Sequence, residues 1–314
     1  MSSNHPIQSF SLASVSISAR YNSSLSEGAP FVEEPGIGGG ASTAFFYVRK
    51  EQWYLVTAWH CVTGSDPNTL RPFDRSIRVL PDTLQLHLFR NGPDQGTIKP
   101  LSRSNMFLNL SDSNGLPTYG IHPHYKQACD VAVFPLSDEF MADLRKGGPD
   151  GLNDVVALAV NEEAASKIRL AITDHLLVVG YPYGLQIAPV VKKGTLAMDP
   201  SYLALYDPPY LLLDIATRQG FSGSPVYRYV DDDFIDKAGK LVELPHDCPC
   251  AVEFVGIYTG RYPSLLSSDT EQFGMFKPSW LIDEIIDSGC AVHPTDLLPV
   301  DFNRNTDTIL MPEK

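Results

Sequence analysis

Short stretches rich in β-branched and aromatic residues recur along the chain, each bounded by Gly, Pro, Asn or Asp. This pattern is typical of β-strands that end in turns. It predicts strands at residues 12–18, 42–48, 52–58, 76–80, 83–89, 130–135, 175–180, 189–197, 210–215, 224–230 and 252–259. Many short strands separated by turns indicate an all-β barrel or sandwich.

Helical periodicity is sparse by comparison. The clearest case is Pro278–Ser288, where one apolar stripe is formed by Leu281, Ile282, Ile285 and Ile286. Pro278 lies just inside the start of this segment and Gly289 just past its end, as helices prefer. Weaker helical patterns cover residues 138–145 and 162–167.

The strongest breaker cluster in the middle of the chain is Lys146–Gly151. We place a boundary between two β domains there. The resulting division is an N-terminal β-barrel at residues 1–146, a C-terminal β-barrel with its helix at 147–290, and a tail at 291–314. Long loops are expected at residues 64–75 and 231–250.

Composition narrows the class of protein. The 314 residues are 43% hydrophobic and 19% charged, as in a soluble globular protein. The net charge is −13 and no basic cluster interrupts it, which argues against nucleic acid or an anionic membrane as a partner. Apolar runs such as His175–Gly180 are far too short to span a bilayer.

The cellular location is also an expectation from the sequence. The first twenty residues have neither a basic leader nor an unbroken apolar stretch, so no signal peptide is expected. Five cysteines form no obvious disulfide framework. A cytoplasmic protein with reduced thiols is expected, and an export route that the sequence does not display stays open.

Three segments carry chemistry: Thr57–Cys61 at the end of an apolar strand, Asp130–Val133 opening another strand, and Gly220–Pro225 leading into a third. The last answers a specific need of acyl transfer, an exposed hydroxyl beside converging backbone N–H groups. Glycines on both sides of Ser222 let the backbone turn those amides inward. Because serine is a weak nucleophile, it also needs a base and a group that orients the base. His60 and Asp130 fit those roles if the fold brings them together.

The TAWHC, DVAVF and GFSGSP segments resemble the three signature blocks of chymotrypsin-like (trypsin-like) serine proteases, in the family's order of His, Asp and Ser. The His122–Tyr125 stretch, the strand at Val255–Gly260 and the C-terminal helix also match the family in position. The resemblance runs from about Gly36 to Gly289. It is closest to bacterial-type trypsin-like domains that lack disulfides.

The resemblance implies two antiparallel six-stranded β-barrels and a serine endopeptidase with His60, Asp130 and Ser222 as catalytic triad. The amides of Gly220 and Ser222 would form the oxyanion hole. No cofactor is implied. Substrates would be proteins or peptides, and an activating protein partner is conceivable.

Two positions depart from the family pattern. Cys61 has no cysteine on the strand 42–48 to pair with, so we expect a small buried residue there. Zymogen-activated members carry an aspartate just before the serine, where this chain has Phe221. Activation by insertion of a new N-terminus is therefore not expected.

Alignment with the family places the base of the specificity pocket near Ala216. Its walls would come from Thr217 and from Thr259, Gly260 and Arg261. No acidic residue stands where the family selects Lys or Arg. Small or apolar substrate side chains are expected, while Arg218 or Arg261 leaves acidic ones open.

Other motifs that could bind a metal or a phosphate have simpler structural explanations. His246–Cys250 contains zinc-type ligands, but the spacing is too tight for a usual structural site, so we expect a loop and no metal. His122 and His124 are expected in a turn. The glycine-rich run at 36–40 lacks the lysine of a phosphate-binding loop and is expected to be a linker.

Two other functions compete with an active protease. An α/β-hydrolase esterase would need G-x-S-x-G on a strand-to-helix elbow and its histidine last in the chain, unlike the order here. A protease-like module could instead hold peptides in the cleft without cutting them, or the protease could be latent until a partner activates it. An intact triad does not by itself prove turnover.

Overall fold

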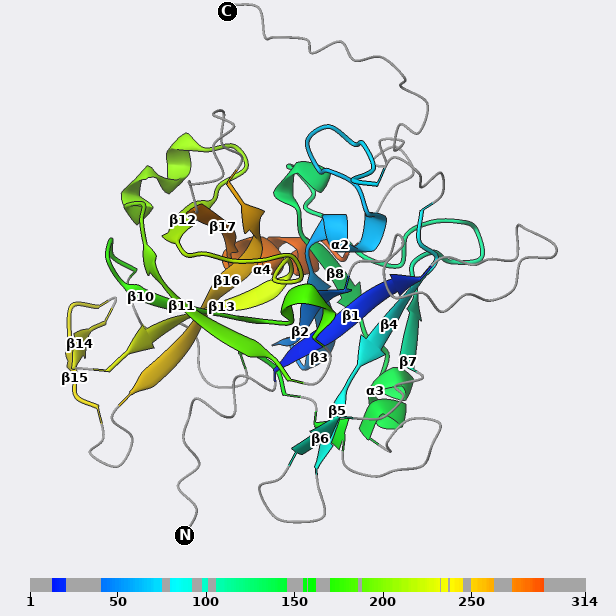
Figure 1. Ribbon diagram of the computed structural model, residues 1–314, viewed down its shortest axis with the longest axis horizontal. Coiled ribbons are helices and arrows are strands. Elements are labelled where there is room, and N and C mark those ends of the chain that lie inside the picture. The colour runs from blue at the N-terminus through cyan, green and yellow to red at the C-terminus, as the bar shows by residue number, and fades with distance from the viewer. Residues whose placement is uncertain are drawn as a thin grey trace, which may run out of the picture.

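The computed structural model describes residues 13–20, 41–74, 80–91, 98–100, 106–145, 155–156, 158–161, 170–185, 188–231, 233–236, 238–244, 250–262 and 273–290. Two β-structures lie side by side, with helix α4 (Trp280–Asp287) packed against them (Figure 1). The predicted helix at 162–167 and most of the predicted strand at 76–80 lie outside the described residues, as do the central breaker cluster and the tail.

The first β-structure is a six-stranded antiparallel sheet in the order β7-β4-β1-β2-β3-β8, which forms a half-barrel. Its strands are β1 (Ser14–Arg20), β2 (Ala41–Arg49), β3 (Gln52–Thr57), β4 (Thr83–His87), β7 (Met106–Asn109) and β8 (Ala132–Pro135). Strands β2 and β3 meet at the two-residue turn Lys50–Glu51, where φ is 51° and 65°. Positive φ at both positions is the hairpin geometry that matches the strand twist.

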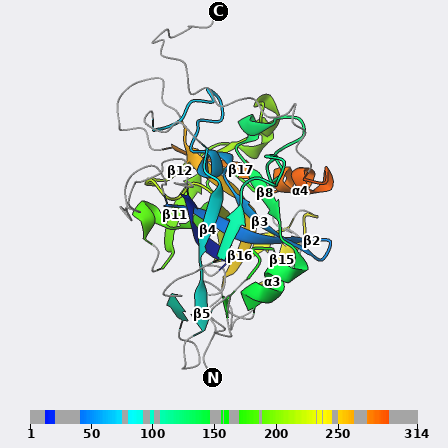
Figure 2. The ribbon, with the colours of Figure 1, turned by 90° about the vertical axis from the view of Figure 1, so that its right-hand side faces the viewer.

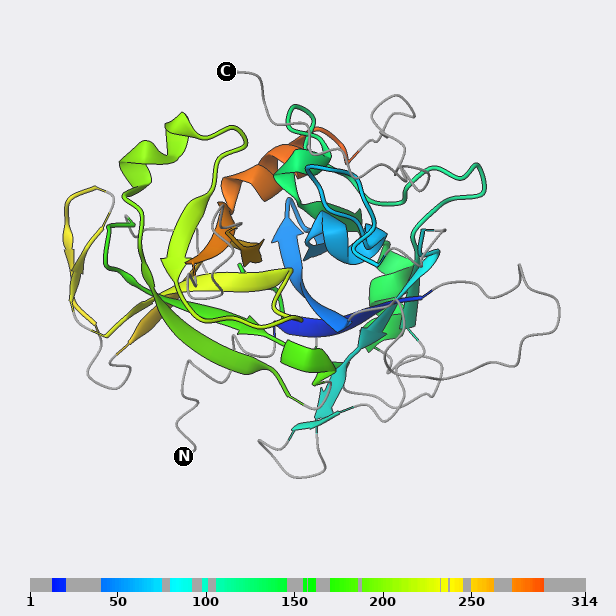
Figure 3. The ribbon, with the colours of Figure 1, turned by 45° about the horizontal axis from the view of Figure 1, so that its top comes forward.

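The second β-structure is a closed antiparallel barrel in the order β10-β11-β12-β17-β16-β13. Its strands are β10 (His175–Gly180), β11 (Val190–Leu196), β12 (Leu211–Asp214), β13 (Ser224–Val230), β16 (Ala251–Arg261) and β17 (Phe273–Pro278). The ring of strands can be followed when the molecule is tilted forward (Figure 3). The expected all-β class with two six-stranded sheets is confirmed.

Shorter strands and helices accompany the two six-stranded sheets. They are the strands β5 (Phe89–Asn91), β6 (Ile98–Pro100), β9 (Val155–Val156), β14 (Phe234–Ile235) and β15 (Leu241–Val242), and the helices α2 (Trp59–Thr63) and α3 (Asp138–Arg145). Single 3₁₀ turns lie at η2 (Gln127–Cys129), η4 (Pro182–Gly184) and η5 (Pro200–Leu205). The predicted helix at 138–145 is confirmed as α3.

Strands β7 and β17 were not predicted from the pattern. In β17 the alternation is hidden because Gly274 contributes no side chain and Lys277, a residue expected in water, is buried. The domain division stays a prediction. After the undescribed breaker cluster, β9 still pairs with β5, and Ala159 still bridges to Phe46 of β2.

Helix α4 holds the two β-structures together from one side (Figure 2). Its predicted stripe, Leu281, Ile282, Ile285 and Ile286, is buried. The same apolar cluster takes in Phe45 and Val56 from the first sheet and Leu177 and Val179 from the barrel. One continuous core thus joins both halves, and the relative position of their loops is set by packing.

Candidate active site

The structure brings His60 and Asp130 together although seventy positions separate them in the chain. His60 Nδ1 lies 2.8 Å from Asp130 Oδ2 and 3.0 Å from Oδ1. The backbone N–H of His60 also donates to Asp130 Oδ1 at 3.0 Å. Because the carboxylate binds both the ring and the backbone of one residue, the orientation of the imidazole is fixed. Its second nitrogen, Nε2, points away from Asp130.

Local chain geometry explains this approach. Helix α2 starts directly after β3, so His60 leaves the sheet edge at a defined point. Asp130 follows the single turn η2 and has left-handed backbone angles, φ 56° and ψ 39°. The sequence predicted that Asp130 opens a strand, but β8 begins only at Ala132. The left-handed residue turns the carboxylate toward α2 before the strand starts, a conformation that Asp tolerates better than most side chains.

The electrostatics favour a charged pair. Burial of the imidazole acts to lower the pKa of His60, but the Asp130 carboxylate and the neighbouring Cys61 thiol outweigh it and raise the pKa well above the usual 6.5. The His60 side chain keeps 15% exposure whereas that of Asp130 keeps 5%. The carboxylate is therefore shielded from water while one edge of the ring stays accessible.

Ser222 lies on a loop that is pinned from both β-structures. Its carbonyl accepts from the N–H of Thr43 in β2 at 3.0 Å, and the N–H of Gly223 donates to the carbonyl of Tyr258 in β16 at 2.8 Å. The Thr43 hydroxyl donates to the Gly220 carbonyl at 2.8 Å and accepts from the Tyr181 N–H at 3.0 Å. Phe221, 1% exposed, anchors the loop in the core of the closed barrel.

Glycine is required at both ends of this loop. Gly220 has φ 102°, and a Cβ there would lie 2.2 Å from the Tyr181 carbonyl oxygen. Gly223 has φ 83°, and a Cβ there would lie 2.0 Å from the Thr43 carbonyl oxygen. Any other residue would be strained and would collide with backbone. The glycines that were predicted to let the loop turn do so.

Two carbonyl hydrogen bonds set the direction of the amides beside Ser222. The Gln219 carbonyl accepts from the Tyr183 N–H at 2.8 Å, and the Phe221 carbonyl accepts from the Ser224 N–H at 3.0 Å. In a trans peptide the N–H points opposite to the C=O, so these bonds orient the N–H groups of Gly220 and Ser222. Within the described ranges neither N–H has a backbone partner. Both amides are thus available to a ligand oxygen.

Ser222 and His60 approach the same place from different sheets. The Cβ position at Gly223 is 2.4 Å from Oγ1 of Thr57, the last residue of β3, three positions before His60. The half-exposed Ser222 makes no hydrogen bond with the ring of His60 in the part of the chain that the structure covers. Catalytic hydrogen bonds are often long before substrate binds, so a missing bond between the two side chains is compatible with a catalytic role.

The residues predicted to contact substrate differ in their exposure. Thr217 and Thr259 are buried, Ala216 and Gly260 are half-buried, and Arg261 is exposed. The Thr217 hydroxyl and the Tyr258 hydroxyl lie 2.5 Å apart. The Thr259 hydroxyl is buried with no hydrogen-bond partner among the described residues.

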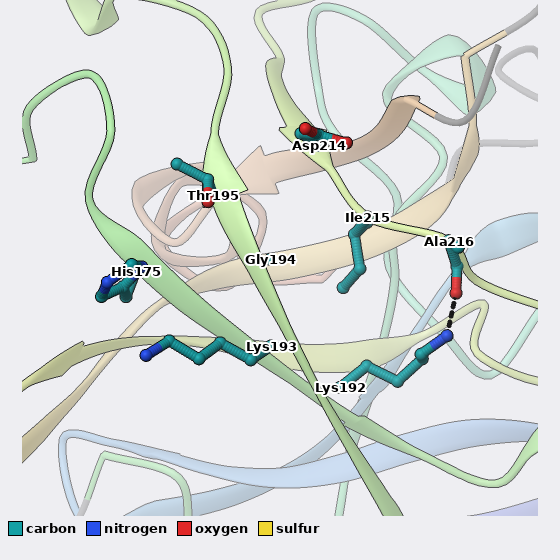
Figure 4. Close-up of a pocket in the computed structure, with 8 residues that line it drawn as sticks. All are labelled: His175, Lys192, Lys193, Gly194, Thr195, Asp214, Ile215 and Ala216. Carbon is teal, nitrogen blue, oxygen red and sulfur yellow. Dashed lines mark hydrogen bonds between the residues drawn. The ribbon is translucent and has the colours of Figure 1, made fainter.

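A hollow of about 470 Å³ opens on the barrel side of Ala216, lined by His175, Lys192, Lys193, Gly194, Thr195, Asp214, Ile215 and Ala216. The Lys192 ammonium donates to the Ala216 carbonyl (Figure 4). This bond ties β11 to the segment that leads to Ser222.

One charged neighbour was missed from the sequence. Lys277 on β17 is 3% exposed, and its ammonium lies 5.5 Å from the centroid of the Tyr210 ring. Burial lowers the pKa of Lys277, and the nearby Cys129 thiol and Asp130 carboxylate partly offset that effect. A buried lysine is rare unless a charge lies near it. The only sequence signal was a lysine beside a proline in an otherwise apolar run.

The histidines suspected as ligands have structural partners. His122 is 3% exposed, its Nε2 lies 2.8 Å from Glu284 Oε2 of α4, and its Nδ1 accepts from the N–H groups of His124 and Tyr125. Most of the segment 246–250 lies outside the described residues. No group of three or more metal-ligating side chains occurs in the residues with a described placement.

The profile of the trypsin-like peptidase domain matches residues 42–235, more than half of the chain and including all three motif segments. The chain belongs to this family, whose members are proteases acting on proteins or peptides. A search of curated proteins found no match. No described helix is long and apolar enough to cross a membrane.

Solved structures with a similar arrangement include proteases. An HtrA-type protease with a tripeptide is 14% identical with a TM-score of 0.43, over 92% of this chain and 63% of that one. A serine endoprotease from Yersinia pestis is 15% identical with a TM-score of 0.39, over 92% and 66%. An active-form protease from M. tuberculosis is 13% identical with a TM-score of 0.41, over 93% and 87%. The chain thus spans less than two thirds of the length of each of the first two proteins.

Proposed function

We propose that this protein is a serine endopeptidase in which Ser222 is the nucleophile, His60 the general base and Asp130 the residue that orients the base. The observation that carries the proposal is the His60–Asp130 pair, with distances of 2.8 and 3.0 Å, beside a rigid loop that presents Ser222. The N–H groups of Gly220 and Ser222, which have no backbone partner within the described ranges, support the proposal further.

The chemistry follows from these positions. Ser222 Oγ attacks the carbonyl carbon of the substrate while its proton passes to His60 Nε2. The carbonyl oxygen becomes an oxyanion, which the N–H groups of Gly220 and Ser222 stabilise. The C–N bond then breaks, and the amine leaves with the proton from His60. The product is an ester between the substrate's acyl group and Ser222.

Water completes the cycle. His60 removes a proton from a water molecule, which attacks the ester carbonyl through a second oxyanion at the same amides. The ester bond breaks, Ser222 Oγ recovers its proton from His60, and the carboxylic acid is released. Asp130 keeps the Nδ1 proton in place and stabilises the imidazolium in both steps.

The test is covalent labelling with a biotinylated fluorophosphonate, followed by intact mass. Wild type is expected to gain one adduct, and Ser222→Ala and His60→Ala are expected to gain none. Ser224→Ala is the matched control, because the Ser224 hydroxyl is buried without a hydrogen-bond partner among the described residues. It should label like wild type. Absence of an adduct on wild type, also after addition of cell extract that could supply an activating partner, would favour a peptide-binding module instead.

A further inference from the structure

The nucleophile loop determines where a substrate side chain must go. When a carbonyl oxygen binds the amides of Gly220 and Ser222, the side chain on the same residue projects beside the loop. That space is bounded by the segment Ala216–Gln219, which runs directly into Gly220, and by β16. The Gly223 N–H donates to the Tyr258 carbonyl at 2.8 Å, so Tyr258 marks the point where β16 touches the loop.

The side chain of Tyr258 already fills the inner part of this space. It is 1% exposed, and its hydroxyl lies 2.5 Å from the Thr217 hydroxyl, on the segment that leads to Ser222. On the neighbouring strand β17, a Cβ added to Gly274 would lie 2.6 Å from Tyr258 Cε2 and 2.8 Å from Ile215 Cγ2. The ring therefore occupies the room between β16, β17 and the segment 215–217.

The surroundings keep the ring in place. It belongs to the apolar cluster of the closed barrel, together with Leu213, Ile215, Phe221 and Phe276. The Thr217 hydroxyl is the hydrogen-bond partner of the phenol, and moving the ring outward would leave two buried hydroxyls unpaired. Burial raises the pKa of Tyr258 to about 12, so the phenol stays neutral.

We propose that Tyr258 closes the floor of the specificity pocket, so that this protease cleaves after residues with small side chains such as Gly, Ala or Ser. The proposal rests on the proposed function, because it uses Ser222 as the point of attack. Thr217 acts with Tyr258 as a positioning residue that holds the ring. Arg218 and Arg261 are exposed and therefore take no part in this buried floor.

The test compares peptidyl diphenyl phosphonates that differ only in the side chain before the phosphorus: Ala, Leu or Phe. Wild type is expected to react with the Ala probe at least about a hundredfold faster than with the Phe probe, since a closed pocket has no room for the larger side chain. Tyr258→Val removes the ring and should raise the rate for the Leu and Phe probes at least about tenfold. Tyr258→Phe keeps the ring and is expected to keep the order Ala, Leu, Phe.

Two controls keep the test decisive. If Tyr258→Val does not fold, as judged by its thermal transition, Thr217→Val frees the ring with little change in volume and should narrow the gap between the Ala and Phe probes. Fluorophosphonate labelling of the same samples reports on the reactivity of Ser222 and does not depend on the specificity pocket. If wild type is not labelled, the proposed function fails. If wild type is labelled but reacts as fast with the Phe probe as with Ala, or if opening the floor leaves the preference unchanged, the Tyr258 proposal is overturned.

Discussion

At the scale of single residues, the His60–Asp130 pair determines the pH range in which the site can work. The raised pKa of His60 means that the folded protein holds the imidazolium proton more tightly than an unfolded chain does. The ion pair stabilises the fold below pH 6.5, and this contribution is lost as the pH rises through the folded-state pKa. A general base must be neutral. The catalytic rate should therefore rise over the same pH range in which the ion pair ceases to stabilise the fold.

The first prediction concerns this pH dependence. The rate of peptide cleavage should rise with pH, and the midpoint of this rise should lie above pH 6.5. Asp130→Asn removes the charge that raises the pKa of His60. The midpoint should therefore move to lower pH, while the maximal rate falls by about 10⁴-fold. A pH–rate profile of both proteins checks this. A midpoint at or below 6.5 in wild type, unmoved by Asp130→Asn, would contradict the assignment of the base.

The second prediction concerns Gly220. A methyl group there would meet the Tyr181 carbonyl oxygen at 2.2 Å, so Gly220→Ala should displace the amide that faces the substrate. Loss of one oxyanion donor slows catalysis by about 10²–10³-fold, and we expect a similar loss in the rate of fluorophosphonate labelling.

The control for Gly220→Ala is Gly239→Ala. Gly239 also has a positive φ, 78°, but has open space around its Cβ position. It bears the same kind of backbone strain without the collision and should label at the wild-type rate. Equal rates for both variants would show that the Gly220 amide is not used.

At the scale of elements, the nucleophile loop is held by side chains that no active-site motif contains. Thr43 on β2 binds the Gly220 carbonyl and the Tyr181 N–H with one hydroxyl, while Phe221 anchors the loop in the barrel core. Zymogen-activated members of the family carry the aspartate of an ion pair at the position of Phe221. In this chain the buried Phe221 ring packs in the barrel core instead.

The third prediction tests the Thr43 contact. Thr43→Val keeps the volume but leaves a buried carbonyl and a buried N–H unpaired, which costs about 1–3 kcal/mol. The free energy of unfolding should fall by that amount, and labelling of Ser222 should slow because Gly220 is no longer held. Thr43→Ser restores the hydroxyl and should restore the labelling rate. If Thr43→Val labels as fast as wild type, the loop does not depend on β2.

Helix α4 is the other decisive element. Ile285 is fully buried in the cluster shared by both β-structures, and Asp287 on the same helix makes ion pairs with Arg49 and Lys50 at the surface. These two cations lower the pKa of Asp287 to about 2. The helix therefore contributes by packing on one face and by charge on the other.

The fourth prediction compares these faces. Ile285→Ala should lower the free energy of unfolding by about 2–5 kcal/mol, as expected for a fully buried aliphatic side chain. Asp287→Ala should cause a much smaller change, because exposed ion pairs are screened by water and salt. Urea denaturation of both variants measures the difference. The reverse order would mean that charge, and not packing, attaches the helix.

At the scale of the whole molecule, the site exists only where two β-structures meet. His60 and Asp130 come from the first sheet and its loops, Ser222 from the closed barrel, and Thr43 links them across the boundary. A core continuous from Phe45 to Leu177 and α4 holds this arrangement. The relative position of His60 and Ser222 is thus a property of the packing of the two β-structures, neither of which carries both residues.

Sequence pattern predicted much of this molecule but not its details. Residues such as Leu281 and Ile285 repeat at helical spacing, so α4 could be located, and glycines around Ser222 revealed the loop. The left-handed turn at Asp130 could not be predicted, because it depends on how η2 meets α2 in three dimensions. Nor could the burial of Lys277 and Tyr258, since both side chains occupy space that only the closure of the barrel creates.

The most direct test of the central claim is detection of the acyl-enzyme. The protein is mixed with a peptide ester ending in Ala, quenched in acid within the first turnover, digested, and its peptides weighed by mass spectrometry. We expect the acyl mass on the peptide that contains Ser222, rising and then falling as substrate is consumed, and absent in His60→Ala. Cleavage of the ester with no acyl group on Ser222 would contradict the account, and so would undiminished cleavage by Ser222→Ala.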